Sequence, residues 1–226
     1  MSGAIDALGL SPARCAWIAL FCCLPLFAHA APLTRAEIGE TCTGAEDAGH
    51  CGRLIETLQL ARLPNLARRE GNALTVSLFP SGSTTFTDDD DPVNGRSYSL
   101  WDYLDSINSA VLYVTAGDNA SFVLLQRTTG RRVDLPAEPR LSPDRLHFAV
   151  ADVCAQHCGN EIAVWRVTRD GFRKELRWKV GAAWSDAGAM WRDADTLAIE
   201  FNVDPSGAST TIERKLADPA WTRIAP

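Results

Sequence analysis

The sequence predicts a mainly β protein, an antiparallel meander of short strands preceded by one short N-terminal helix. From Leu74 onward, short runs alternate between apolar and polar residues, which is the period of a half-buried strand. Turn-forming groups separate these runs at roughly 8–12-residue intervals, as in β-sandwiches, barrels and propellers. These turns include Pro80–Gly82, Gly117–Asn119, Arg169–Gly171 and Asp204–Gly207. The predicted fold is therefore a set of blade-like units, as an incomplete propeller or a sandwich.

The expected strands follow one another from residue 74 to residue 216. Residues 74–87 read as two strands around the first turn, and residues 110–135 as a hairpin followed by a third strand. Residues 98–108 match neither the alternation of a strand nor the three-and-four spacing of a helix, so their structure stays ambiguous. The remaining strands are expected within 146–153, 161–167, 172–180, 196–203 and 209–216. Together they assign residues 73–226 to one β-meander domain.

Residues 31–72 are expected to form a disulfide loop and the helix. Leu54, Ile55, Leu58 and Ala61 recur at spacings of three and four, which predicts an amphipathic helix with these residues on its apolar face. Pro64 should end it, because proline lacks the N–H that a helix interior needs.

Residues 1–30 have the pattern of a secretory signal peptide. Arg14 precedes the apolar run 15–27, and Ala28-His29-Ala30 provides a small-x-small cleavage motif. Cleavage is expected before Ala31, giving a periplasmic or secreted protein. Since the rest of the chain has no long apolar run, no membrane insertion is expected after cleavage.

Four of the seven cysteines lie outside this segment. An even number in an exported protein indicates disulfides. Of the three possible pairings we expect the local one, Cys42 with Cys51 and Cys154 with Cys158. The second pair encloses His157, which raises the alternatives of a redox or zinc site. A redox motif has two residues between its cysteines, not three, and an oxidising compartment favours a structural staple over a metal.

Residues 105–203 contain a weak internal repeat. Leu146 and Leu197 begin equivalent strands 51 positions apart, and one propeller blade takes roughly 40–50 residues. The segment Ser142–Ala149, SPDRLHFA, resembles the entry of WD40-like blades of the TolB type, and a longer similarity is to exported bacterial proteins of unassigned function. Arg145 stands where that motif has glycine, and only three or four units fit the chain. The resemblance implies an incomplete propeller or open meander and says little about activity.

The composition and the absence of known motifs exclude several classes of function. The formal net charge of −6 argues against nucleic acid as a partner, since nucleic-acid binding needs clustered Lys and Arg. The sequence lacks the nucleophile-elbow, zinc-protease, P-loop and dinucleotide-binding motifs. We therefore expect no cofactor, no metal and no recognisable catalytic residues, although a pair of carboxylates is invisible without the fold.

Two features are candidates for binding. Asp88, Asp89, Asp90 and Asp91 form an acidic run that could hold a hard cation, although a solvated loop is the simpler interpretation. Trp184 lies in the Gly/Ala/Ser/Asp-rich stretch 181–189 and is the tryptophan most expected to be exposed. The preferred hypothesis is a non-enzymatic protein that binds another envelope protein or a polymer. The alternative is a hydrolase of an envelope glycan or peptide that uses paired carboxylates.

Overall fold

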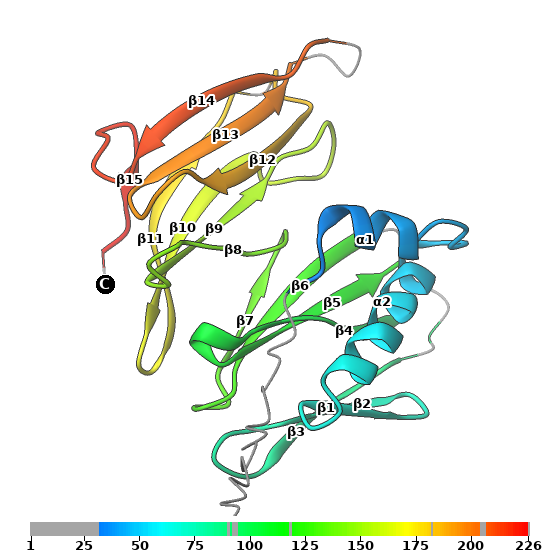
Figure 1. Cartoon of the computed structure of the whole chain (residues 1–226). Coiled ribbons are helices and arrows are strands. Elements are labelled where there is room, and N and C mark those ends of the chain that lie inside the picture. Colours follow the sequence, from blue (N-terminus) through cyan, green and yellow to red (C-terminus); the bar gives the residue numbers. More distant parts are fainter. Residues whose placement is uncertain are drawn as a thin grey trace, which may run out of the picture.

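The computed structural model describes residues 32–89, 91, 95–117, 119–181, 183–203 and 207–225. In these ranges the protein is mainly β, as the sequence predicts: four antiparallel sheets and two α-helices (Figure 1). The predicted signal peptide, residues 1–30, lies outside the described residues. Within the described ranges the sheets do not close into a propeller, and no helix has the length and apolar character to span a membrane.

The sheets follow the chain in order, each made largely of strands adjacent in sequence. The first contains β1 (Ala67–Glu70), β2 (Ala73–Ser77) and β3 (Ser83–Thr87). The second contains β4 (Arg96–Leu104), β5 (Ser109–Ala116), β6 (Asn119–Gln126) and β7 (Arg132–Leu135), with a 3₁₀ turn at Asp105–Ile107.

The third sheet has five strands, ordered β15-β11-β10-β9-β8. They are β8 (Arg140–Leu141), β9 (His147–Asp152), β10 (Glu161–Thr168), β11 (Gly171–Lys179) and β15 (Thr222–Arg223). The fourth sheet contains β12 (Asp186–Trp191), β13 (Thr196–Asn202) and β14 (Thr210–Lys215). The hairpins expected from the alternating runs are confirmed, whereas β12 was not predicted because its Gly/Ala-rich sequence carries little period-two signal.

Three apolar cores join neighbouring sheets. The first lies between the β1–β3 and β4–β7 sheets, around Leu74, Phe86 and Leu112. Another lies between the β4–β7 and β8–β11 sheets, around Leu124 and Phe148. The last joins the β8–β11 and β12–β14 sheets. Because each sheet buries side chains against the next one, the four sheets form a continuous stack along the chain.

The turn between Ser142 and His147, which carries the blade-like motif, has a defined geometry. The Ser142 hydroxyl accepts from the His147 N–H at 3.0 Å, and an Asp144 carboxylate oxygen accepts from the Leu146 N–H at 3.0 Å. Arg145 adopts a φ of 65°, the left-handed conformation that glycine takes without a steric cost. Arg145 thus occupies the backbone state expected of the glycine that it replaces in the motif.

The N-terminal region contains one helix more than expected. Helix α1 (Arg35–Thr41) begins with a capping box, in which the Thr34 hydroxyl accepts from the Glu37 N–H and the Glu37 carboxylate accepts from the Thr34 N–H. This Thr-x-x-Glu pattern is a known helix-start signal, so the sequence contained the information that identifies α1.

Helix α2 (Ala48–Arg62) packs against β4 through a different face from the predicted one. Of the four residues expected on its apolar face only Ile55 is buried, and Leu58 is 40% exposed. Glu56 and Gln59 face inward instead, with Gln59 Nε2 donating to the carbonyl of Trp101 at 2.8 Å. The prediction of that face was wrong because these polar residues find partners on the sheet.

The partners of Glu56 form an ion-pair cluster, defined here as Arg53, Glu56, Arg69 and Asp88. Arg69 donates to the two carboxylate oxygens of Glu56 at 2.7 and 2.8 Å and to Asp88 at 2.9 Å. Arg53 contacts both acids. The second Glu56 oxygen also accepts from the Leu100 N–H at 2.9 Å. The cluster therefore connects α2 to β1, β4 and the segment after β3.

Candidate functional site

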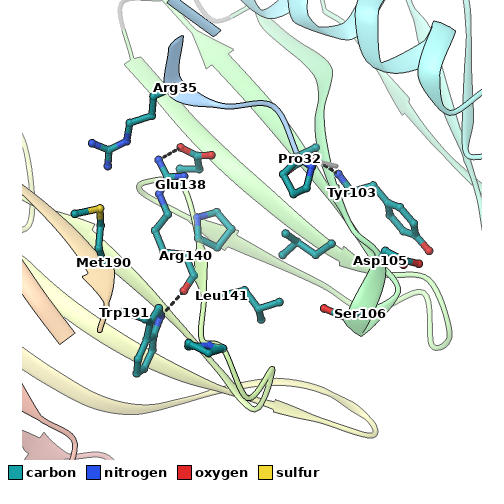
Figure 2. Close-up of a pocket in the computed structure, with 14 residues that line it drawn as sticks. Pro32, Arg35, Tyr103, Asp105, Ser106, Glu138, Arg140, Leu141, Met190 and Trp191 are labelled. Carbon is teal, nitrogen blue, oxygen red and sulfur yellow. Dashed lines mark hydrogen bonds and ion pairs between the residues drawn. The ribbon is translucent and has the colours of Figure 1, made fainter. Parts of the chain in front are cut away.

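A cavity in the described part of the chain lies where three sheets and the N-terminal segment meet (Figure 2). Its volume is about 730 Å³, which lies within the roughly 300–1,000 Å³ typical of small-molecule sites. The end of β4, the start of β8 and the end of β12 contribute to its wall. Its lining includes the charged residues Arg35, Asp102, Glu138 and Arg140 and the aromatic residue Trp191. The Tyr103 side chain turns to the core between the first and second sheets, where its hydroxyl donates to Asn108 Oδ1 at 2.8 Å.

A β-bulge in β4 determines how Asp102 reaches this cavity. The register between β4 and β5 shifts between Leu100 and Asp102, so that Trp101 and Asp102 together oppose Val111. Residues opposite one another share a face of the sheet, and Val111 lies in the core between the second and third sheets. The bulge therefore directs the Asp102 carboxyl to a largely apolar face, a position that bulges often create beside functional sites.

Glu138 is held in place by neighbours on both sides. One of its oxygens accepts from Trp101 Nε1 at 3.1 Å, and the other accepts from Arg140 Nη2 at 2.6 Å. The carbonyl of Arg140 in turn accepts from Trp191 Nε1 at 2.7 Å, and Figure 2 shows both interactions of Arg140. A hydrogen-bonded chain thus runs from the second sheet to the fourth and fixes the charged and aromatic groups of the wall.

The environment of Asp102 raises the pKa of its carboxyl above the usual value. Burial is the largest cause, because it disfavours the charged form. The hydrogen bond from the Tyr103 N–H opposes this effect, the negative charge of Glu138 adds to it, and the positive charges of Arg62 and Arg140 oppose it. Asp102 is therefore a partly buried acid that retains its proton to higher pH than an exposed aspartate.

The raised pKa makes a testable prediction about stability. In the unfolded chain Asp102 loses its proton near the ordinary pKa of about 3.9, whereas the folded protein keeps it to higher pH. The wild type should therefore lose stability relative to Asp102→Asn as pH rises from about 3 to about 7. A tenfold difference in proton affinity corresponds to about 1.4 kcal/mol. Urea unfolding of both proteins at the two pH values measures this, and a pH-independent difference would contradict it.

A smaller hollow of about 170 Å³ continues from the cavity and shares Arg35, Glu138 and Arg140 with it. Its floor consists of small residues on β9 and β12, including Ala151 and Gly188. The Arg35 guanidinium reaches over this floor, with Nη2 4.0 Å from the position of a Cβ built on Gly188. The cavity and the hollow together give the site the shape of a short groove.

The acidic run is not part of this site. The Asp88 carboxylate belongs to the ion-pair cluster and also accepts from the Tyr98 N–H at 2.8 Å, with 8% of the side chain exposed. Asp89 pairs through its backbone with Arg96 and accepts from the Asp91 N–H at 3.1 Å. Asp90 lies outside the described residues.

Trp184 is half-buried and also lies away from the cavity wall. Its ring stacks on Phe201 with centroids 3.7 Å apart and meets Trp178 edge-on at 5.4 Å. Arg214 lies over the Trp178 ring at 3.9 Å. These contacts make the tryptophan group part of the core between the third and fourth sheets.

The structure has the two expected local disulfides. Cys42 is bonded to Cys51, and Cys154 to Cys158 with Cα atoms 5.5 Å apart. His157 is exposed, with a φ of 68°. No group of three or more His, Cys, Asp or Glu side chains suited to a metal occurs within the described ranges. Disulfides are typical of oxidising compartments outside the cytoplasm.

Sequence reasoning missed every charged residue of the cavity wall. Asp102 and Trp191 lie in stretches with no motif, and the bulge that orients Asp102 has no sequence signature. The neighbouring pair Glu138 and Arg140 is likewise ordinary in sequence. No protein-family model matches the chain, no curated protein matches it significantly, and no solved structure does so either.

Proposed function

We propose that the protein is exported to the bacterial cell envelope and binds a segment of a glycan in the cavity between its sheets. The apolar run and cleavage motif of residues 1–30 support export to the periplasm or beyond. The two disulfides agree with an oxidising compartment. The four sheets, in this proposal, are blade-like units of an incomplete propeller, supported by the backbone state of Arg145.

The observation that carries the proposal is the combination of groups on the cavity wall. Trp191 contributes an aromatic ring, while Glu138, Arg140 and Asp102 contribute polar groups of both signs. Sugar residues present apolar C–H faces and a rim of hydroxyls, so a wall of this kind complements them. A fixed wall also lowers the entropic cost of binding, because Glu138 and Arg140 already hold each other in place.

The concave shape favours a narrow polymer over a folded protein. Protein partners usually bury a surface of about 800 Å² on each side, whereas this cavity is lined by three sheets and continues into a small groove. A chain of linked sugars fits such a groove, and so does an extended peptide. The Trp191 ring and the polar groups of the wall favour the sugar, and the experiment below separates the two.

Calorimetric titration of the protein lacking residues 1–30 tests the proposal. The probes are chitohexaose, cellohexaose, maltohexaose, soluble peptidoglycan strands and a random decapeptide library. At least one glycan should bind, and Trp191→Ala should weaken binding at least tenfold, or about 1.4 kcal/mol. Binding of peptides but no glycan, or of no probe, would contradict the proposal.

Two further variants distinguish a loss of glycan binding from a loss of fold. Ser106 is exposed at the edge of the cavity, so Ser106→Trp should obstruct binding without disturbing the core. Phe79 is 56% exposed and does not line the cavity, so Phe79→Ala should bind as the wild type does. Unchanged binding by Ser106→Trp would assign the glycan to another surface.

A further inference from the structure

The smaller hollow differs from the main cavity in its charge. Its charged lining residues are two arginines, Arg35 and Arg140, and one acid, Glu138, so its formal charge is positive. The main cavity shares these three residues and adds the acids Asp102 and Asp105, which makes its formal charge negative. A negative substituent on a bound glycan is therefore favoured in the hollow and opposed in the main cavity.

The acid of the hollow already has partners within the protein. The Glu138 carboxylate accepts from Arg140 Nη2 at 2.6 Å and from Trp101 Nε1 at 3.1 Å. Within the described ranges the Nε and Nη1 groups of Arg140 donate no hydrogen bond. The positive charge of the hollow that remains unbalanced is therefore that of Arg35, with further donors of Arg140 beside it.

The Arg35 guanidinium has no partner of its own. The side chain is exposed and makes no hydrogen bond or ion pair with any residue that the structure describes, and Figure 2 draws none. Glu200 lies opposite Gly188 across β12 and β13, on the same face of the sheet. Its carboxylate accepts from the Ser209 hydroxyl at 2.8 Å instead of pairing with Arg35. The guanidinium thus keeps all its donors for a ligand.

Gly188 keeps the space in front of this guanidinium open. A Cβ built on Gly188 would meet only Arg35 Nη2 within 4 Å, at 4.0 Å. A larger side chain at this position would therefore extend into the hollow, which has a volume of about 170 Å³. The open space suits a small substituent of a sugar whose ring lies in the main cavity.

Resting on the proposed glycan binding, we infer that the protein selects an acidic glycan, whose carboxylate enters the hollow and pairs with the Arg35 guanidinium. A guanidinium donates two parallel hydrogen bonds to a carboxylate, and a singly charged carboxylate balances the one unpaired arginine. Two kinds of sugar carry such a group, a uronic acid and a sugar with a lactyl ether. Both present the same planar anion, and the test separates them.

Two matched pairs of glycans test the inference by calorimetric titration. Cellohexaose and the glucuronic acid hexamer of the same linkage differ in their carboxylates. Chitohexaose and peptidoglycan strands freed of peptides differ in the lactyl groups. At about 0.15 M salt, remote charges of this acidic chain are largely screened. At least one acidic glycan should bind about tenfold more tightly than its neutral counterpart, the scale of a hydrogen bond to a charged group. Methyl esterification of that glycan should remove the preference.

Two variants assign the preference to the hollow. Arg35→Gln removes the unpaired charge, and Gly188→Val fills the space with a residue that favours strands. Each should lower the preference to about twofold or less and keep the affinity for the neutral glycan within about threefold of the wild type. Arg169→Gln is the matched control, because Arg169 is exposed and lines neither the cavity nor the hollow. Thermal unfolding confirms that each variant is folded.

The outcomes separate this inference from the proposed function. Neutral glycans that bind as tightly as the acidic ones would overturn the inference and leave glycan binding intact. A preference that survives Arg35→Gln and Gly188→Val, or that Arg169→Gln reduces equally, would overturn its assignment to the hollow. A preference in one pair only supports the inference and identifies the source of the carboxylate. If no glycan binds, the proposed function fails and the inference fails with it.

Discussion

Replacing Glu56 by alanine is expected to lower the free energy of unfolding by about 3–5 kcal/mol, the usual cost of breaking a buried ion pair by removing one partner. Only 4% of the Glu56 side chain is exposed. Its loss leaves the Arg69 guanidinium without the two bonds to its main partner and the Leu100 N–H without an acceptor. Buried groups left without partners account for most of the expected effect.

Urea unfolding monitored by tryptophan fluorescence measures this change. Glu70→Ala is the matched control, because Glu70 pairs with Arg68 on the surface, where both side chains are largely exposed. Exposed ion pairs contribute about 0–1 kcal/mol, so the control should change little. Equal losses in both variants would show that the cluster does not hold α2 on the sheet.

Replacing Ile55 by alanine is expected to cost about 2–5 kcal/mol, the range for deleting a buried isoleucine side chain. Ile55 is fully buried beneath α2, in the core that contains Trp101 and Leu124. Leu58 lies one turn further along the same helix but is 40% exposed. Leu58→Ala should therefore cost less than about 1 kcal/mol, since exposed side chains contribute little.

The two helix variants give a direct comparison of the predicted and the observed helix face. Thermal unfolding of both, followed by circular dichroism, ranks the two positions without any assumption about the rest of the molecule. A larger loss for Leu58→Ala than for Ile55→Ala would support the face predicted from the spacing of apolar residues. The reverse ranking supports the orientation set by the ion-pair cluster.

Local patterns predicted the strands and the disulfides well because both depend on nearby residues. Alternating runs such as 110–116 and 119–126 form strands directly, and Cys154 needs only four more residues to reach its partner. The face of α2 depends instead on partners distant in sequence, such as Asp88, 35 residues from Arg53. Periodicity counts apolar residues and therefore misjudges a helix that turns charged groups inward.

The cavity was beyond sequence analysis for the same reason. The bonds from Trp101 to Glu138 and from Trp191 to Arg140 span 37 and 51 residues. No spacing rule connects such positions, because the packing of one sheet on the next determines them. The acidic run from Asp88 to Asp91 attracted attention through local charge density, whereas the described structure has Asp88 in an interior ion-pair cluster.

The disulfides also have a consequence for the order of events in folding. Each bridge joins cysteines that are consecutive among the four, Cys42 to Cys51 and Cys154 to Cys158. A bond between Cys51 and Cys154 would instead close a loop of about 100 residues, at a greater entropic cost. An oxidant that links each of these cysteines to the next one along the chain forms both native bonds without forming a non-native one. The observed pairing is therefore the one that sequential oxidation along the chain produces.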